Sequence, residues 1–292
     1  MKRKFEKPIL KIEYDALEPQ KKIKTEKNNV YEVWHDVSNW TEYQTKNVLK
    51  MNVVEMEEFA PKFIKTCDLP IELLDLVAPS VEKKHITTYN PKKFKDLPER
   101  TDMMASHLFQ IVASKRRETE ERNPEAPVDG FVSFLFDSLG FASRGLLFRP
   151  KPKQIMQYGE IEIIAIPDYG VKRFDDLDSF VLLEESKPRG IKSGFDHQIM
   201  GQMFVFAWAK FEMIGEDVDL FSLAVSGTYV VFYFVHFPVS YMNKIKQDLI
   251  PDESDMVSIY KSKIYDFIDK EDRKECIENL YSIRQQLRLE IF

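Results

Sequence analysis

The chain has 292 residues, of which 43% are hydrophobic and 13% aromatic, and this apolar content suits a buried core and excludes wholesale disorder. The formal net charge of −6 excludes a global attraction to nucleic acid, so a nucleic-acid ligand would require a local basic surface. Two cysteines are too few for a disulfide framework or a zinc cluster, and no apolar run is long enough to span a membrane, so we expect a soluble, intracellular protein with no membrane partner.

The first hundred residues divide into a tail and an extension. Residues 1–30 are polar and basic, which predicts a flexible tail, with a nuclear-import segment or a phosphate-contacting arm as the alternative. The lysine-rich ends indicate the nucleus only if the host is a eukaryote. Residues 31–100 are expected to form a mostly helical extension, because residues 41–59 have helical spacing and residues 68–80 contain a short helical segment bounded by prolines.

Residues 101–240 carry the signals of the main domain. The predicted order is a helix, three strands, a helix and one or two further strands, which implies a mixed central α/β sheet flanked by helices. Residues 241–292 are expected to add a C-terminal helical segment. The predicted elements of the main domain are helices over 102–122 and 131–141, strands over 145–151, 160–167 and 180–187, a helix over 196–215, and two strands within 218–237.

The predicted strand 180–187, "FVLLEESK", ends in charged residues. Successive side chains of a strand alternate between its faces, so Glu185 and Lys187 share one face and Glu184 points to the other. Asp168 ends the preceding predicted strand, and the 16 residues between it and Glu185 allow a return loop that sets the two strands side by side. We therefore expect Asp168, Glu185 and Lys187 to converge at the end of the sheet. The alternative is a surface ion pair of Glu185 and Lys187 on an edge strand.

These three residue types have a defined chemical use when they lie together. Two carboxylates offer hard oxygen ligands to Mg²⁺ or Mn²⁺, and a neighbouring lysine can hold a water molecule or stabilise a developing oxyanion. Phosphodiester hydrolysis uses these parts, because a cation neutralises the extra charge of its transition state while the lysine orients or deprotonates the nucleophile. The pattern thus indicates metal-dependent phosphodiester hydrolysis.

Two short segments, "IPD" at 166–168 and "EESK" at 184–187, resemble the motif of the PD-(D/E)xK nuclease superfamily, whose restriction-endonuclease-like fold has an αβββαβ core. The resemblance covers about residues 125–237. It implies that Asp168 and Glu185 bind the metal together with the backbone carbonyl of Ser186, and that Lys187 is the catalytic lysine. It also implies a nuclease with Mg²⁺ or Mn²⁺ as cofactor, acting on DNA in preference to RNA.

Two other classes of function stay open. One is a catalytically inactive protein of the same fold that binds nucleic acid or a protein partner, and the other is an interaction protein with no nuclease ancestry. The oligomeric state is open as well, a homodimer included.

Two glutamines, Gln198 and Gln202, lie four residues apart on the predicted helix 196–215 and form one polar stripe on its surface. In exonuclease-like branches of the superfamily, a glutamine on this helix, often within a QxxxY pattern, points into the active site. The resemblance therefore implies a catalytic role for Gln198. The tyrosine of that pattern is absent, since Phe206 follows Gln202 at that spacing. As an alternative, one glutamine satisfies a backbone group inside the core.

The superfamily often adds an acidic residue from its first helix. Four acids are compatible with this place by their order in the chain, and we prefer Glu125, which immediately precedes the apolar helix. The four are Glu118, Glu121, Glu125 and Asp137.

Basic residues around the predicted site are candidates for contacts with the phosphate backbone. Arg189 and Lys192 lie in the glycine-containing loop "PRGIKSG" at 188–194, and Lys151 and Lys153 follow the first predicted strand. A plain connecting loop is the alternative for 188–194. No pattern for zinc, for a phosphate-cradling glycine loop or for a serine nucleophile elbow competes with this interpretation.

Overall fold

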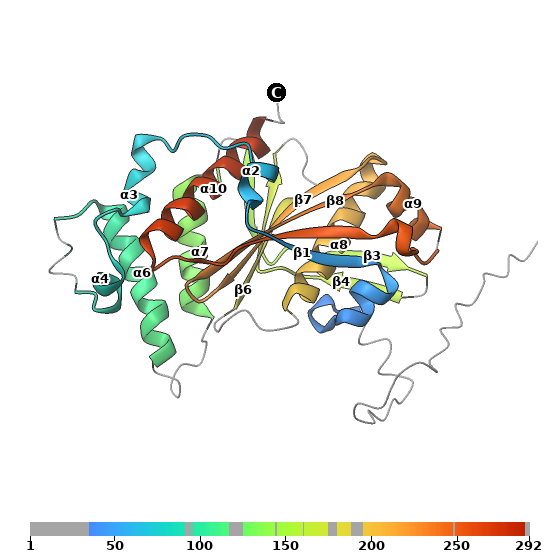
Figure 1. Cartoon of the computed structure of the whole chain (residues 1–292), viewed down its shortest axis with the longest axis horizontal. Helices are drawn as coiled ribbons and strands as arrows, with labels where there is room; N and C mark the ends of the chain where they lie inside the picture. Colours follow the sequence, from blue (N-terminus) through green and yellow to red (C-terminus); the bar gives the residue numbers. More distant parts are fainter. Residues whose placement is uncertain are drawn as a thin grey trace, which may run out of the picture.

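A twisted mixed sheet of eight strands runs through the middle of the molecule and carries helices on both faces (Figure 1). The computed structural model describes residues 35–90, 94, 96–116, 125–143, 145–159, 161–174, 180–187, 195–247 and 249–289. The described chain is a mixed α/β protein, and this confirms the sheet-and-helix class that the order of elements predicted. Residues 1–30, expected to be a flexible tail, lie outside the described residues.

Within the described ranges the strands are β1 (Met51–Met56), β2 (Leu146–Pro150), β3 (Gln154–Tyr158), β4 (Ile161–Ala165), β5 (Tyr169–Arg173), β6 (Phe180–Lys187), β7 (Val218–Ser226), β8 (Tyr229–Phe237), β9 (Val257–Ser262) and β10 (Tyr265–Asp266). The main sheet has the order β1-β9-β8-β7-β6-β5-β2, and β10 pairs with β8. β6 runs parallel to β7 and β1 runs parallel to β9, whereas the other neighbours in the sheet are antiparallel. β3 and β4 form a separate antiparallel hairpin.

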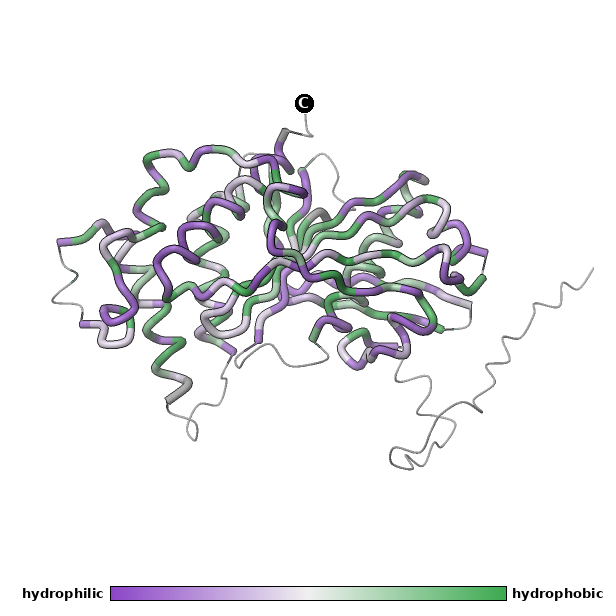
Figure 2. Tube along the Cα trace, viewed as in Figure 1, coloured by the Kyte–Doolittle hydropathy of each residue, from purple (hydrophilic) through white to green (hydrophobic). Residues whose placement is uncertain are grey.

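Two hydrophobic cores cover the two faces of the main sheet. One core contains α2 (Phe59–Phe63), α3 (Leu74–Val77), α4 (Lys83–Thr87), α6 (Glu99–Arg116), α7 (Ala126–Leu139) and α10 (Lys270–Leu289). The other contains α8 (Phe195–Ile214), α9 (Val239–Lys246) and the hairpin β3–β4. Short helical turns are η1 (Val37–Asn39), η2 (Tyr43–Val48), η3 (Ile71–Leu73) and η4 (Glu253–Asp255). Figure 2 shows that hydrophobic residues gather along the central strands, as expected for a sheet covered on both sides.

Helix α8 is apolar around most of its circumference because structure surrounds it. The main sheet covers one side, and the hairpin β3–β4 and the segment around η1 cover others. Gly201 allows the closest of these contacts, since a Cβ atom there would lie 2.7 Å from Cε3 of Trp40 and 2.9 Å from Cβ of Val37. Despite its length and apolar surface, α8 does not qualify as a membrane span, and neither does any other helix in the described ranges.

The two ends of the described chain contribute strands that their local patterns did not predict. β1 occupies residues 51–56, where helical spacing predicted a continuing helix, and it pairs with β9. β9 and β10 lie within 241–292, where the sequence predicted a helical segment, so these residues contribute two strands in addition to helices. The physical reason is that these strands obtain their hydrogen bonds from partners distant in sequence, and such partners override weak local preferences.

The three strands predicted before α8 were partly misassigned. β2 and β6 agree with the predicted strands 145–151 and 180–187, but β4 lies within 160–167 and belongs to the separate hairpin. The third strand of the main sheet is β5, whose sequence "YGVKR" has a glycine and two basic residues and therefore a weak strand pattern. Gly159, with φ of 58°, provides the left-handed backbone that the tight turn between β3 and β4 requires.

Candidate active site

Asp168 and Glu185 lie next to each other at the edge of the main sheet that is formed by strand ends, where β5 begins and β6 ends. Tyr169 pairs with Glu184 across the antiparallel strands β5 and β6, and this register sets Asp168, one residue earlier, opposite Glu185. The backbone N–H of Ser186 donates a hydrogen bond of 2.7 Å to Oδ2 of Asp168. Asp168 thus immediately precedes β5 instead of ending the strand 160–167, and the return connection that we predicted between the two acids is β5 together with the segment that follows it.

Glu185 is held by three side chains, although it is only 3% exposed. Its Oε1 accepts hydrogen bonds of 2.6 Å from Nζ of Lys187 and from Nε2 of Gln198, and its Oε2 accepts one of 2.6 Å from Nε2 of Gln202. Burial, followed by the charge of Asp168, raises the pKa of Glu185, while Lys187 and Gln202 act in the opposite direction. Both glutamines of the polar stripe on α8 therefore contact Glu185.

Lys187 points toward the same place from the end of β6. Its Nζ lies 6.0 Å from the centre of the Phe195 ring, at the first residue of α8. Burial alone would lower the pKa of Lys187, but the charge of Glu185 and their hydrogen bond outweigh burial, so this pKa is raised. Lys187 is consequently a cation at neutral pH.

Lys151 pairs with the other carboxylate. Its ammonium donates a hydrogen bond to Oδ1 of Asp168, and its backbone N–H donates one of 2.8 Å to the carbonyl of Asp168. Lys151 was predicted as a contact to the phosphate backbone, and the structure brings it directly to the two acids. Lys153 is exposed in the connection between β2 and β3. Arg189 and Lys192, the other two basic candidates, lie outside the described residues.

The opposite face of β6 carries a second acid, Glu184, which is 0% exposed. Its Oε1 accepts a hydrogen bond of 2.9 Å from the hydroxyl of Ser186, and its Oε2 has no hydrogen-bond partner among the described residues. Burial, followed by the charge of Asp168, raises the pKa of Glu184 well above its ordinary value. Glu184 therefore favours its neutral form, and this is how a second glutamate is accommodated at the end of a buried strand.

Asp129 of α7 is an acid of this region that the sequence did not single out. Burial and then the charge of Asp168 raise the pKa of Asp129, and the charges of Lys151 and Glu125 also act on it. Glu125 is the N-cap residue immediately before α7, four residues ahead of Asp129, so the preferred first-helix acid lies on the same side of the helix as Asp129. That four-residue spacing is the signal that would have suggested Asp129. Asp137 lies at the other end of α7, and Glu118 and Glu121 lie outside the described residues.

The donor set at this edge fits a small divalent cation. Asp168 and Glu185 supply hard carboxylate oxygens, and the backbone carbonyl of Ser186 belongs to the residue that already contacts Asp168. Among the residues that the structure describes, no group of three or more His, Cys, Asp and Glu side chains is arranged to hold a metal ion. Two carboxylates are nevertheless sufficient protein ligands for Mg²⁺, which usually keeps several water molecules.

The charges of this edge do not cancel. With Glu184 in its neutral form, the acids Asp129, Asp168 and Glu185 still outnumber the two ammonium groups of Lys151 and Lys187, and the charge of Asp168 contributes to the raised pKa of Asp129, Glu184 and Glu185. A bound divalent cation would relieve this repulsion, because it is a larger local charge than any side chain.

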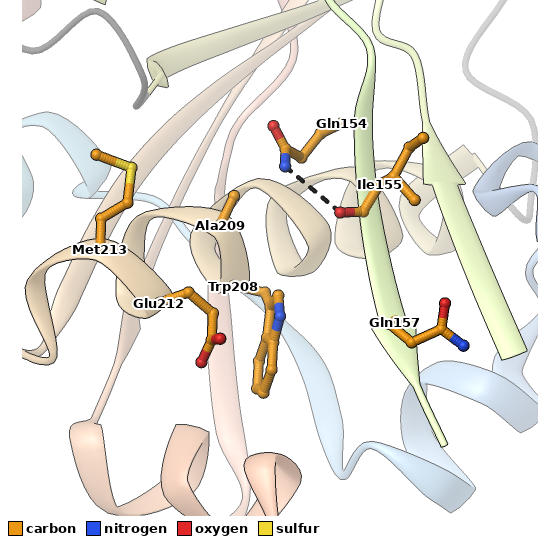
Figure 3. A pocket seen from close by; sticks show the side chains of 7 residues that line it. All are labelled: Gln154, Ile155, Gln157, Trp208, Ala209, Glu212 and Met213. Carbon is orange, nitrogen blue, oxygen red and sulfur yellow. Dashed lines mark hydrogen bonds between the residues drawn. The ribbon is translucent and has the colours of Figure 1, made fainter. Parts of the chain in front are cut away.

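A cavity of about 500 Å³ lies elsewhere, between the second half of α8 and strand β3 (Figure 3). Of the residues that line it, Glu212 is the one ionisable side chain, and it forms an ion pair of 2.9 Å with Lys246. None of the lining residues belongs to the group around Asp168 and Glu185. This cavity therefore lacks the acids and lysines that gather around Asp168 and Glu185. The cavity is lined by Gln154, Ile155, Gln157, Trp208, Ala209, Glu212 and Met213.

No model of a known protein family matches the chain, and no curated protein matches its sequence.

Proposed function

We propose that the protein is a metal-dependent nuclease of the PD-(D/E)xK type, which hydrolyses phosphodiester bonds in DNA in preference to RNA. The observation that carries this proposal is the position of Asp168 opposite Glu185, with one lysine ammonium on each carboxylate. Paired carboxylates with adjacent cations are the groups that bind a divalent metal and stabilise a phosphoryl transition state.

The order of elements around the site supports the same proposal. α7 is followed by β2, β5 and β6, then by α8 and β7, with the hairpin β3–β4 inserted between β2 and β5. β2, β5 and β6 are neighbours in antiparallel order, and β6 then pairs with β7 in parallel. This order of a helix, three strands, a helix and a strand agrees with the order expected for a restriction-endonuclease-like core, and the two motif segments lie where β5 begins and β6 ends.

In the proposed reaction Asp168 and Glu185 would hold Mg²⁺ or Mn²⁺, and the carbonyl of Ser186 would be a further ligand. A bound divalent cation would supply Lewis acidity at the scissile phosphate. Lys187 is protonated and adjacent, so it stabilises the negative charge that develops on the phosphate oxygens. Gln198 and Gln202 keep the carboxylate of Glu185 in one orientation, and Gln198, the less buried of the two glutamines, also orients a water molecule or a phosphate oxygen.

One observation favours a second candidate, a nucleic-acid-binding or protein-binding protein of the same fold without catalysis. Each of the two carboxylates already accepts hydrogen bonds from an ammonium group and from amide N–H groups. These hydrogen bonds stabilise both buried carboxylates without a metal. Replacing Lys187 by alanine separates the two candidates, since a binding protein would retain its ligand whereas a nuclease would lose cleavage.

The test of the proposed function is a cleavage assay of the purified chain on single-stranded DNA, duplex DNA and RNA, with Mg²⁺, Mn²⁺ or EDTA. We expect metal-dependent cleavage that Asp168→Asn reduces by a factor of about 10² or more. Asp255→Asn is the matched control, because the Asp255 side chain is 12% exposed and pairs with Lys244, while that of Asp168 is 11% exposed and pairs with Lys151. Cleavage that persists in EDTA, or that both variants retain equally, would contradict the proposal.

A further inference from the structure

We propose that Lys151 is a second catalytic cation of this site and that its ammonium binds the scissile phosphate alongside Lys187. This inference rests on the proposed nuclease function. It adds Lys151, which lies outside the two motif segments and directly follows β2, the last strand in the order of the main sheet.

The backbone fixes where Lys151 lies. It follows the last residue of β2 with φ of 46°, a left-handed conformation that is uncommon for residues other than glycine. In this conformation its N–H donates to the carbonyl of Asp168 at 2.8 Å, so the turn after β2 is joined to the start of β5. The side chain therefore starts beside Asp168 and does not reach it from a distant loop.

The side chain of Lys151 combines a contact with the site and access to solvent. Its ammonium donates to Oδ1 of Asp168, yet the side chain is 64% exposed whereas that of Asp168 is 11% exposed. An ammonium has three N–H donors, so the contact to Asp168 leaves others for a ligand.

Lys151 and Lys187 occupy corresponding places on the two carboxylates. Lys187 contacts Glu185, and Lys151 contacts Asp168, so an ammonium lies on each side of the pair. A phosphate placed against the two acids meets an excess of negative charge, and a cation on each side offsets that repulsion in the transition state more than in the ground state.

The role of Lys151 is electrostatic and requires no proton transfer. During hydrolysis a water oxygen forms a bond to phosphorus while the bond from phosphorus to the leaving oxygen breaks. The water loses one proton to solvent and the leaving oxygen gains one from solvent, so no proton is required from Lys151. The ammonium of Lys151 is hydrogen-bonded to Asp168, and a lysine side chain is ordinarily charged at neutral pH.

The test compares Lys151→Met with Lys50→Met. Lys50 is a matched control because it also has a left-handed φ, 49°, next to a strand and forms an ion pair, of 2.6 Å with Glu253, on the far edge of the sheet. Two quantities are measured for each variant: the single-turnover rate of DNA cleavage, and the affinity for Mn²⁺ alone by calorimetry. Thermal melting followed by circular dichroism verifies that each variant is folded.

We expect Lys151→Met to slow cleavage by a factor of about 10². We also expect this variant to bind Mn²⁺ at least about threefold more tightly than the wild-type chain, because the metal no longer competes with an ammonium for Asp168. Lys151→Arg should retain cleavage to within about tenfold, since its charge is preserved. Lys50→Met should match the wild-type chain in both measurements.

Three results would overturn the role of Lys151: wild-type cleavage by Lys151→Met, loss of cleavage together with loss of Mn²⁺ binding, or equal loss in Lys151→Arg and Lys151→Met. The second would make Lys151 a support of the metal site. An inactive wild-type chain would instead refute the proposed function itself, and the role of Lys151 with it.

Discussion

Replacing Arg273 with methionine tests whether the C-terminal helix α10 is an integral part of the fold. Arg273 is 0% exposed and donates hydrogen bonds to four backbone carbonyls, three within residues 77–81 and one at Phe267. Burial lowers its pKa to about 10, so it remains charged at neutral pH. The four acceptors are the carbonyls of Val77 at 2.8 Å, Phe267 at 2.9 Å, Ala78 at 3.1 Å and Val81 at 2.6 Å.

The expected loss of stability follows from this number of contacts. A hydrogen bond contributes a net of about 1 kcal/mol, and a buried carbonyl left without its donor costs roughly 1–3 kcal/mol. Methionine fills part of the volume and removes the cost of burying a cation, which offsets some of this loss. We therefore expect Arg273→Met to lower the free energy of unfolding by about 3–5 kcal/mol. The corresponding fall in Tm is roughly 10 °C for a chain of this size.

Urea denaturation of the wild-type chain and of Arg273→Met measures this loss directly. Arg288→Met is the control, since Arg288 lies on the same helix and contacts Gln285 of that helix at 3.2 Å. The control should change the free energy of unfolding by less than about 0.5 kcal/mol. A loss below about 1 kcal/mol for Arg273→Met, or an equal loss for both variants, would refute the view that α10 is anchored through these carbonyls.

Gly201→Ala should destabilise the protein by about 1–3 kcal/mol in urea denaturation despite the better helix propensity of alanine, because the new Cβ would overlap Trp40; a more stable variant would contradict this packing. Burial lowers the pKa of His107, whose ring stacks on Phe134 with 5.0 Å between the ring centres. As the pH falls through about 6.5, His107 therefore becomes protonated in the unfolded chain while it stays neutral in the folded chain. Between neutral pH and about pH 5 the wild-type protein should therefore lose more stability than His107→Phe, and equal losses would refute this assignment. Gln202→Leu should reduce metal-dependent cleavage by roughly 10–100-fold without unfolding, since one donor to Glu185 is lost, and unchanged cleavage would exclude a supporting role.

The part of the site that is local in sequence was predictable. The two-residue period of a strand sets Glu185 and Lys187 on one face, and the four-residue spacing on a helix sets Gln198 and Gln202 on one stripe. The structure has all four side chains in one hydrogen-bonded group. Periodicity was sufficient here because each pair belongs to a single element.

The contacts between elements were not predictable from such patterns. Lys151 contacts Asp168 because β2 pairs with β5. Asp129 is influenced by the charge of Asp168 because α7 packs against the same face of the sheet. Both arrangements depend on the tertiary fold. β5 itself has a weak strand sequence, and it forms because β2 and β6 supply hydrogen bonds on both of its sides. For the same reason β9 was not recognised, since its partners β1 and β8 come from other parts of the chain.

The central claim is that Asp168 and Glu185 together hold a divalent cation at the edge of the sheet. Crystals soaked in Mn²⁺, with anomalous diffraction recorded at the manganese edge, test it most directly. We predict an anomalous peak ligated by carboxylate oxygens of both residues, with the ammonium groups of Lys151 and Lys187 on either side of it. Crystals with no peak at this edge, and with both lysines still paired to the carboxylates, would contradict a metal site there.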